Sequence, residues 1–279
     1  MLEQKVTLLF GPGKLGELGP LVAEKGHRKA FLVCDPGIIA AGILDKVRAS
    51  LAAAGVDSVI YDKVNPEPSH RVPDLGIGVF RESGCDVVVG VGGGSSMDCA
   101  KSINLLRYNE GPILRFAGPN VPMNPSPGLF LVATTSGTGS EVSDGLVMSS
   151  DDGMKHGCLA VNAMAEYAIV DPELMVSMDP ALTAATGLDA FSHACEGYTT
   201  NIASIATDHL VEAVMRTVVD WLPVAVNDGA NVEARAHMAA GATLGGWVLV
   251  QAHTNAGHSV APLLGSYYGI SPRGGRAPA

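Results

Sequence analysis

The sequence predicts an α/β domain with a mostly parallel sheet, followed by an all-α region. Short apolar runs alternate with helix-like segments over residues 5–170, which is the pattern of parallel strands covered by helices. Beyond Asp171 and Pro172 the β-branched runs stop, and helical periodicity extends over residues 181–268. These two observations place a sheet domain before a helical domain.

Each apolar run between turn signals is predicted to be a strand. These strands are expected at residues 5–10, 29–34, 57–61, 86–91, 129–133, 145–149 and 166–170. Helices are expected among them, at residues 38–54, 69–83 and 97–106. The proline-rich residues 107–128 are expected to be irregular. Because Pro180 suits the first turn of a helix, the predicted domains are residues 1–179 and 180–279.

The strand at residues 86–91 leads directly into three glycines, Gly92, Gly93 and Gly94, and then into Ser95 and a helix-like segment. Glycines lack the Cβ atoms that would hold a phosphate away from backbone N–H groups. The helix N-terminus adds about half a positive charge at the same point. We therefore interpret this turn as a diphosphate cradle, and a plain βα turn is the alternative.

A second glycine pattern, G-x-G-x-x-G at residues 11–16, also follows a predicted strand and precedes a helix. Asp35 ends the next predicted strand, 19 residues past Gly16. Together they match the dinucleotide-binding fingerprint, in which an acidic residue accepts a hydrogen bond from the ribose. Such glycine spacing is frequent by chance, so the pattern alone does not decide which turn holds the phosphates.

The composition bears on which partners and which cellular compartment are expected for this protein. The chain has 18 basic and 28 acidic residues, a net charge of −10 and no basic patch, so no nucleic-acid partner is expected. No apolar run reaches the length of a membrane span, and the first residues do not form a signal peptide. The five cysteines are scattered and lack a CxxC motif, which indicates reduced thiols in a cytoplasmic protein.

A candidate metal site begins with Asp189 and His193, which are four residues apart on a predicted helix and share one face. A carboxylate and an imidazole at this spacing can bind one divalent cation, although a simple hydrogen bond is commoner. Further imidazoles follow at His253 and His258. A mixed oxygen and nitrogen set suits Fe²⁺, Zn²⁺, Ni²⁺ or Mn²⁺ and does not choose among them.

Several segments in the same order identify a family resemblance. They are Asn65-Pro66 and residues 92–101, 134–141, 189–197 and 255–258. On these motifs the chain resembles the iron-containing (group III) alcohol dehydrogenases and, more distantly, glycerol dehydrogenase and dehydroquinate synthase. The resemblance covers almost the whole chain. It implies a dehydroquinate-synthase-like nucleotide-binding α/β domain, a helical metal domain and an active site in the cleft between them.

The resemblance assigns the diphosphate to the Gly92 turn and makes the G-x-G-x-x-G turn a look-alike. The cofactor-binding residues that it implies are Asp35, Asn65, Gly92, Gly93, Gly94, Ser95, Asp98, Thr134, Thr135, Thr138, Ser140 and Lys155. The Asp35 carboxylate would accept from the ribose 2′-OH and repel a 2′-phosphate, which favours NAD over NADP. Asn65 and Lys155 would approach the nicotinamide, although an ordinary exposed lysine is an equal interpretation of Lys155.

The metal ligands of the family correspond to Asp189, His193 and His258. The cation implied is Fe²⁺, with Zn²⁺ as the alternative. Cys195 and Glu196 are expected to point elsewhere on the helix and are left out of the ligand set.

The end of the chain departs from the family pattern. The family has a fourth histidine ligand where residues 268–274 read Tyr-Gly-Ile-Ser-Pro-Arg-Gly, and another common histidine is Pro262 here. The family also continues with further helices, whereas this sequence ends at Ala279. We therefore expect a truncation or a reading-frame change at Ser271, and an incomplete helical domain.

These features predict an NAD-dependent alcohol dehydrogenase, most simply of class EC 1.1.1.1. It would transfer a hydride between a small primary or secondary alcohol and NAD, or reduce the aldehyde or ketone in reverse, with a metal polarising the substrate oxygen. The full-length family form is expected to be a homo-oligomer. An ordinary core or surface histidine is the favoured interpretation of His253, and a proton relay is the alternative.

Two other functions stay open. One is a catalytically impaired NAD-binding remnant, suggested by the missing fourth ligand and the missing C-terminal helices. The other is a cyclase-type relative that uses NAD transiently, as dehydroquinate synthase does. The form of the Gly92 and Asp189 motifs counts against the cyclase.

Overall fold

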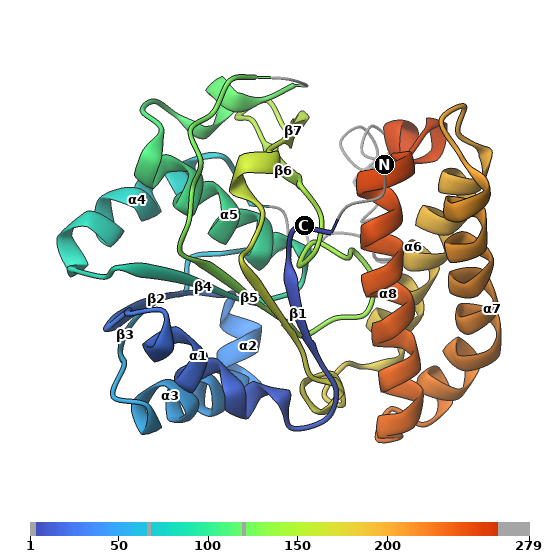
Figure 1. Cartoon of the computed structure of the whole chain (residues 1–279), viewed down its shortest axis with the longest axis horizontal. Helices are drawn as coiled ribbons and strands as arrows, with labels where there is room; N and C mark the ends of the chain where they lie inside the picture. The colour runs from blue at the N-terminus through green and yellow to red at the C-terminus, as the bar shows by residue number, and fades with distance from the viewer. Residues whose placement is uncertain (1–3, 66–67, 119–120, 262–279) are drawn as a thin grey trace.

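The computed structural model describes residues 4–65, 68–118 and 121–261. A six-stranded parallel sheet forms the centre of the first half, with helices on both faces, and three long helices stand beside it (Figure 1). The predicted α/β region followed by an all-α region is therefore confirmed. The expected break at Ser271 and the segment that lacks the fourth histidine lie outside the described residues.

The sheet has the strand order β1-β8-β5-β4-β2-β3, and all neighbouring strands are parallel. Its strands are β1 (Thr7–Phe10), β2 (Lys29–Val33), β3 (Asp57–Tyr61), β4 (Val87–Gly92), β5 (Leu129–Ala133) and β8 (Tyr167–Val170). After β2 the chain moves outward to β3 and then returns to β4 on the other side of β2. The loops that follow β2 and β4 therefore diverge, and such a point is the usual ligand site of an open α/β sheet.

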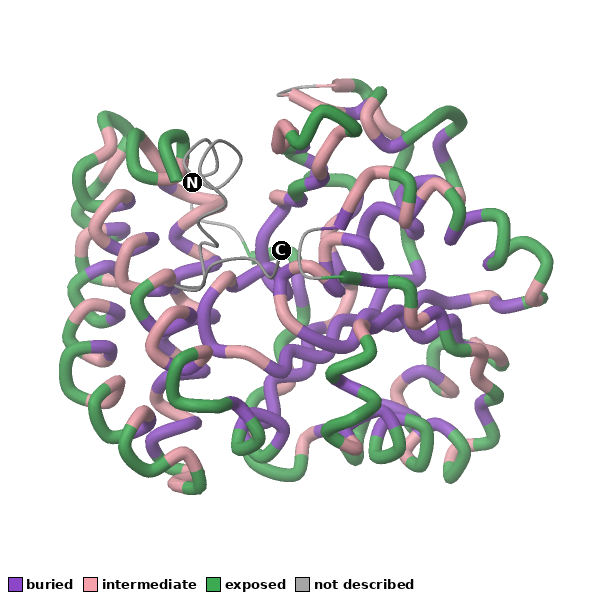
Figure 2. Tube along the Cα trace, turned by 180° about the vertical axis from the view of Figure 1, so that it is seen from behind, coloured by how far each residue is buried: buried purple, intermediate pink, exposed green. Residues whose placement is uncertain are grey.

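Helices cover both faces of this sheet (Figure 1). On one face are α1 (Leu18–Glu24), α2 (Pro36–Ala40) and α3 (Ile43–Ala53), and on the other are α4 (Arg71–Ser83) and α5 (Gly94–Tyr108). Every residue of β4 is buried, and Figure 2 shows buried residues running through the centre of the sheet. Burial on both faces explains why this strand is almost continuously apolar instead of alternating.

One local prediction is wrong, and one predicted strand lies in a different sheet. Residues 38–54 form two helices, because Gly42 adopts a left-handed φ of 69° and separates α2 from α3. The strand predicted at residues 145–149 is present, but it does not join the main sheet. It is β6 (Gly145–Ser149), which pairs antiparallel with β7 (Lys155–Leu159) in a separate two-stranded sheet. The sequence of β7 contains a lysine, a histidine and a glycine, so it has no apolar run to predict it.

The second half consists of α6 (Pro180–Thr199), α7 (Ile205–Asn227) and α8 (Val232–Ala252). The Asp179 carboxylate caps α6 by accepting from the Leu182 N–H group, and Pro180 occupies the first turn as predicted. Small side chains such as Ala190 and Ala194 let the helices pack closely. Across the described residues, no helix combines the length and apolar character that crossing a lipid bilayer requires.

The two halves touch through glycine backbone. A Cβ atom on Gly246 of α8 would lie 2.3 Å from the carbonyl oxygen of Gly139, and a Cβ atom on Gly137 would lie 2.7 Å from the carbonyl oxygen of Thr186. The connection between β5 and β6 therefore lies directly against α6 and α8. Glycine at these positions lets the backbones of the two halves approach each other closely.

Candidate active site

Two neighbouring cavities flank the glycine turn after β4. The first, of about 230 Å³, is lined by residues that follow β2, β4 and β5. Its lining includes Asp35, Asn65, Gly93, Ser95, Thr134 and Thr135. The second cavity, of about 490 Å³, lies between the sheet half and the helical half, and its lining includes Gly94, Asp98, Thr138, Ser140, Asp189, His193, His253 and His258. The turn that joins Gly93 to Gly94 thus borders both cavities.

The carboxylate of Asp35 is held in a fixed position beside the first cavity. One oxygen accepts from the Gly37 N–H group at 2.8 Å, and the other accepts from the Ser96 hydroxyl at 3.1 Å. The turn also packs closely against the loop after β5, because a Cβ atom on Gly93 would lie 3.0 Å from the Thr135 hydroxyl oxygen. The glycine turn and the Asp35 carboxylate are therefore adjacent at the point where the strand order reverses.

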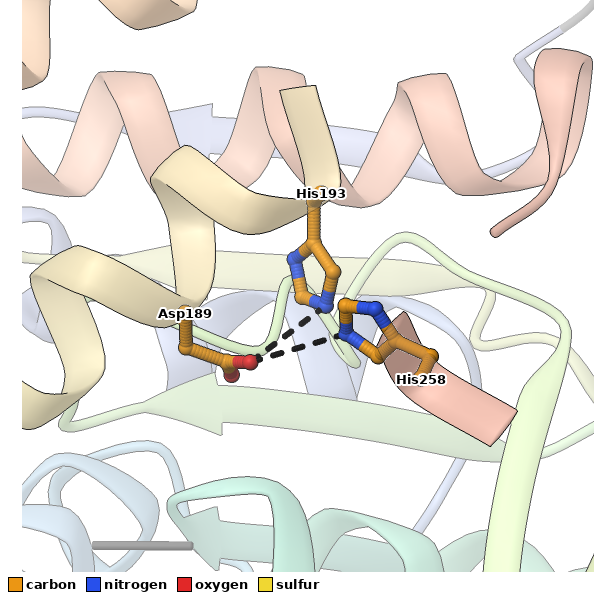
Figure 3. A group of neighbouring side chains, drawn as sticks. All are labelled: Asp189, His193 and His258. Carbon is orange, nitrogen blue, oxygen red and sulfur yellow. Dashed lines mark ion pairs between the residues drawn. The ribbon is translucent and has the colours of Figure 1, made fainter. Parts of the chain in front are cut away.

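The predicted metal ligands meet in the second cavity. One oxygen of Asp189 lies 3.6 Å from His193 Nε2 and 3.7 Å from His258 Nε2, and the two imidazole rings stack with centroids 4.6 Å apart. Figure 3 shows both rings turned toward the carboxylate. One ligand atom from each residue lies within 4.8 Å of the other two. Ligands bound about 2.1 Å from one ion lie roughly 3–4 Å apart, so this donor set fits a divalent cation.

The pKa values of the two histidines shift in opposite directions. Burial lowers the pKa of His193, which keeps its imidazole neutral, the form that binds a metal. For His258 burial also lowers the pKa, but the interactions of the ring with the Asp189 and Glu196 carboxylates, which accept from it, outweigh burial and leave the pKa above its ordinary value. A metal binds the neutral imidazole, so the lowered pKa of His193 favours metal binding and the raised pKa of His258 opposes it.

The expectation that Glu196 points away from the site is wrong. Its carboxylate accepts from His258 Nδ1 at 2.7 Å. Asp189, His193 and Glu196 follow i, i+4 and i+7 spacing, which places all three on one face of α6, and this spacing is the signal that could have found the third. Cys195 does point elsewhere, because its sulfur lies 3.7 Å from the sulfur of Met215 on α7.

A buried polar network supports the wall formed by Asp98 and Ser140. The Asp98 carboxylate accepts from the Ser140 hydroxyl at 2.6 Å, and Lys101 Nζ donates to the same hydroxyl at 2.8 Å. Only 1% of Lys101 is exposed, and it also donates to the carbonyl groups of Ser143 and of Gly145, the first residue of β6. Burial raises the pKa of Asp98 and lowers the pKa of Lys101. Sequence reasoning missed Lys101, because nothing in the pattern distinguishes it from a surface lysine.

Glu141 yields a prediction about pH. It is buried, it accepts from the Thr243 hydroxyl at 2.8 Å, and burial raises its pKa. The native state therefore holds this proton more tightly than the unfolded chain does, so the contribution to stability is present below about pH 4.3 and is lost as pH rises through the native pKa. As the pH rises from 5 to 8, we expect the melting temperature of Glu141→Gln to increase relative to that of the wild type. A pH-independent difference between the two melting curves would contradict this linkage.

Three other predicted features lie at the edges of these cavities or outside them. Lys155 begins β7 and lines neither cavity. His253 lines the second cavity at the end of α8 with a φ of 59°, the one positive φ among the described non-glycine residues. This positive φ coincides with the end of α8, just before the segment that carries His258. The G-x-G-x-x-G turn follows the edge strand β1 and lines neither cavity.

Two family models match the sequence. Residues 6–172 match the model described as iron-containing alcohol dehydrogenase, and residues 183–277 match the model described as Fe-containing alcohol dehydrogenase family, C-terminal. Alcohol dehydrogenase 4 of Schizosaccharomyces pombe is 36% identical over 263 residues. That alignment covers 94% of this chain and 62% of the relative, so the chain spans less than two thirds of the length of that protein.

Solved structures share the fold. The crystal structure of a 1,3-propanediol oxidoreductase has a TM-score of 0.93 at 35% identity, covering 98% of this chain and 72% of that one. A sulfoacetaldehyde reductase from Bifidobacterium kashiwanohense, solved in complex with NAD⁺, has a TM-score of 0.91 at 28% identity, covering 98% of this chain and 73% of that one. With matching models over both halves and this structural agreement, the chain belongs to the iron-containing alcohol dehydrogenase family.

Proposed function

We propose that this chain is a metal-dependent oxidoreductase that transfers a hydride between a small primary or secondary alcohol and NAD, or between NADH and the aldehyde or ketone. One observation carries the proposal. The fixed carboxylate of Asp35 and the triad Asp189, His193 and His258 lie in neighbouring cavities that share the Gly93-Gly94 turn. A dinucleotide lying across that turn would extend from the carboxylate toward the triad.

The first cavity and the turn supply the cofactor contacts in this proposal. Backbone N–H groups at the start of α5 and the positive end of its dipole would bind the diphosphate. Asp35 would accept from a ribose hydroxyl. Hydroxyl groups of Thr134 and Thr135 line the same cavity, and those of Thr138 and Ser140 line the next one, toward the nicotinamide. Bound NAD supplies the hydride acceptor.

The second cavity supplies the metal and substrate contacts. Asp189, His193 and His258 would hold the cation, with Fe²⁺ the first choice and Zn²⁺ the second. A bound divalent cation supplies a Lewis acid that polarises the substrate oxygen. Three protein ligands leave a position for that oxygen. Val147, Leu159 and Leu249 line the cavity and would contact the carbon chain of the alcohol.

The test is an assay of NADH formation with short primary alcohols, with Fe²⁺ or Zn²⁺ added back to protein treated with a chelator. An NADH titration of the same preparation measures cofactor binding separately. We expect metal-dependent turnover together with saturable NADH binding. Binding without turnover under either metal would favour the NAD-binding remnant, and the absence of both would reject the proposed site. The alcohol that reacts fastest would then place the enzyme among the subclasses of EC 1.1.1.

Asp35→Ser is expected to lower the preference for NAD over NADP by about tenfold or more. The serine hydroxyl still offers an acceptor to the start of α2, but the negative charge that would repel a 2′-phosphate is gone. The measurement is the ratio of kcat/KM for the two cofactors. Asp220→Ser, which removes an exposed carboxylate from α7, is the matched control and should leave this ratio unchanged. An unchanged ratio in Asp35→Ser would place the ribose elsewhere.

A further inference from the structure

We propose that Glu196 is the positioning residue that makes His258 a metal ligand. This inference rests on the metal site proposed above and adds a residue that does not itself bind the metal. The side chain of Glu196 is 12% exposed and lies 2.7 Å from His258 Nδ1. That contact joins α6, which carries the first two ligands, to the segment after α8, which carries the third.

Glu196 also holds the backbone of the segment that contains His258. Its carboxylate accepts from the Asn255 N–H group at 2.6 Å and from the His258 N–H group at 3.1 Å. Residues 256–261 are helical, so these are N–H groups at the start of a helix, which lack partners within the helix itself. The Asn255 side chain returns the contact by donating to the Glu196 carbonyl oxygen at 3.2 Å. The carboxylate therefore caps a helix to which it does not belong.

Glycine at position 257 makes this close approach possible. A Cβ atom there would lie 2.3 Å from a carboxylate oxygen of Glu196. Any larger residue would push the carboxylate away from the helix start and from the imidazole ring. The close approach of Gly257 to the Glu196 carboxylate is thus a second contact, separate from the imidazole contact, that places the carboxylate.

The consequence for His258 follows from hydrogen-bond chemistry. An ionised carboxylate only accepts, so the Nδ1 atom that faces Glu196 must carry the hydrogen. In the neutral ring the lone pair is then on Nε2, the atom that lies 3.7 Å from Asp189. Glu196 thereby selects the tautomer and the ring orientation that a metal needs. Partners of this kind typically change metal affinity by about 10- to 100-fold.

The experiment compares wild type, Glu196→Gln and Gly257→Ala, with Glu212→Gln as the matched control on an exposed position of α7. The affinities of the chelator-treated proteins for Zn²⁺ and Co²⁺ are measured by competition with a chromophoric chelator. Glutamine has one accepting oxygen, and its NH₂ group cannot accept from a backbone N–H group. We expect about 10- to 100-fold weaker binding for Glu196→Gln and Gly257→Ala, and wild-type affinity for Glu212→Gln.

A second measurement separates positioning from general damage. The ¹⁵N chemical shifts of the His258 ring in metal-free protein at a fixed alkaline pH report its tautomer. In the wild type the neutral His258 ring should be protonated at Nδ1. In both variants the population of the tautomer protonated at Nε2 should increase. Gly257→Ala keeps the carboxylate, so it tests the geometry even if Glu196→Gln unfolds.

The outcomes distinguish this inference from the proposed function. Suppose that Asp189→Ala loses its metal but both variants keep the metal affinity and the His258 tautomer of the wild type. That result would overturn the role of Glu196 and leave the metal site standing. Wild type that binds metal no better than Asp189→Ala would overturn the metal site and this inference together. Weakened affinity with the expected tautomer shift would support both.

Discussion

Asp189→Ala is expected to abolish metal retention and, with it, turnover. Asp189 faces both imidazoles, and one of its oxygens lies within 3.7 Å of both Nε2 atoms. Without the carboxylate, two stacked imidazoles remain and no anionic ligand offsets the charge of the cation. We expect metal affinity to fall by at least about 100-fold, beyond the effect typical of removing a supporting partner.

The measurement is the metal content per chain after gel filtration, together with the rise in melting temperature when metal is added. A ligand that binds only the native state raises stability by RT ln(1 + [L]/Kd), so wild type should gain melting temperature and Asp189→Ala should not. Asp220→Ala, an exposed position on α7, controls for the loss of one negative charge. Wild-type metal content in Asp189→Ala would mean that the ligand assignment is wrong.

The second large effect is expected for Gly246→Ala. The new Cβ atom would lie 2.3 Å from the carbonyl oxygen of Gly139 and 2.6 Å from its Cα atom, and neither backbone atom can rotate away. Gly139 itself has a φ of 59°, which favours glycine, so the loop has little freedom to adapt. Either α8 or the connection that carries Thr138 and Ser140 must move. We expect a loss of about 3 kcal/mol or more, a melting temperature lower by roughly 10 °C, and weaker NADH binding.

Gly245→Ala is the matched control for this prediction. It lies next to Gly246 in the same helix, and its Cβ atom would meet nothing closer than 3.6 Å. Alanine is favoured over glycine inside a helix by about 1 kcal/mol, so this change should be neutral or stabilising. Equal melting temperatures for the two variants would show that the contact between Gly139 and Gly246 does not hold the halves together.

The parallel sheet was predictable because buried strands leave a strong local signal. The run of valines in β4 is apolar at nearly every position, since both faces are covered. The cap at Asp179 and the proline that follows it likewise mark the start of α6 within a few residues of sequence. Features of this kind depend on neighbours in the chain, which the sequence contains in full.

The burial and the contacts of individual side chains were not predictable in the same way. Lys101 and Arg235 carry charges and would be placed on the surface by composition, yet each is only 1% exposed and donates to several acceptors. From the sequence, Gly246 is simply a glycine that weakens a helix. Its role in the contact with Gly139 is evident only from the structure. The hairpin of β6 and β7 also escaped prediction, because its second strand is polar and its pairing depends on a partner rather than on its own pattern.

The sequence by itself determined the α/β region, the order of its strands along the chain, the glycine turn and the spacing that pairs Asp189 with His193. Only the tertiary structure decided that His258, more than 60 residues later, comes within 3.7 Å of Asp189 and that Glu196 holds it there. The physical reason is the separation along the chain of the residues that make each contact. Helical and strand patterns arise from contacts a few residues apart, whereas these side chains meet because the segment after α8 packs against α6.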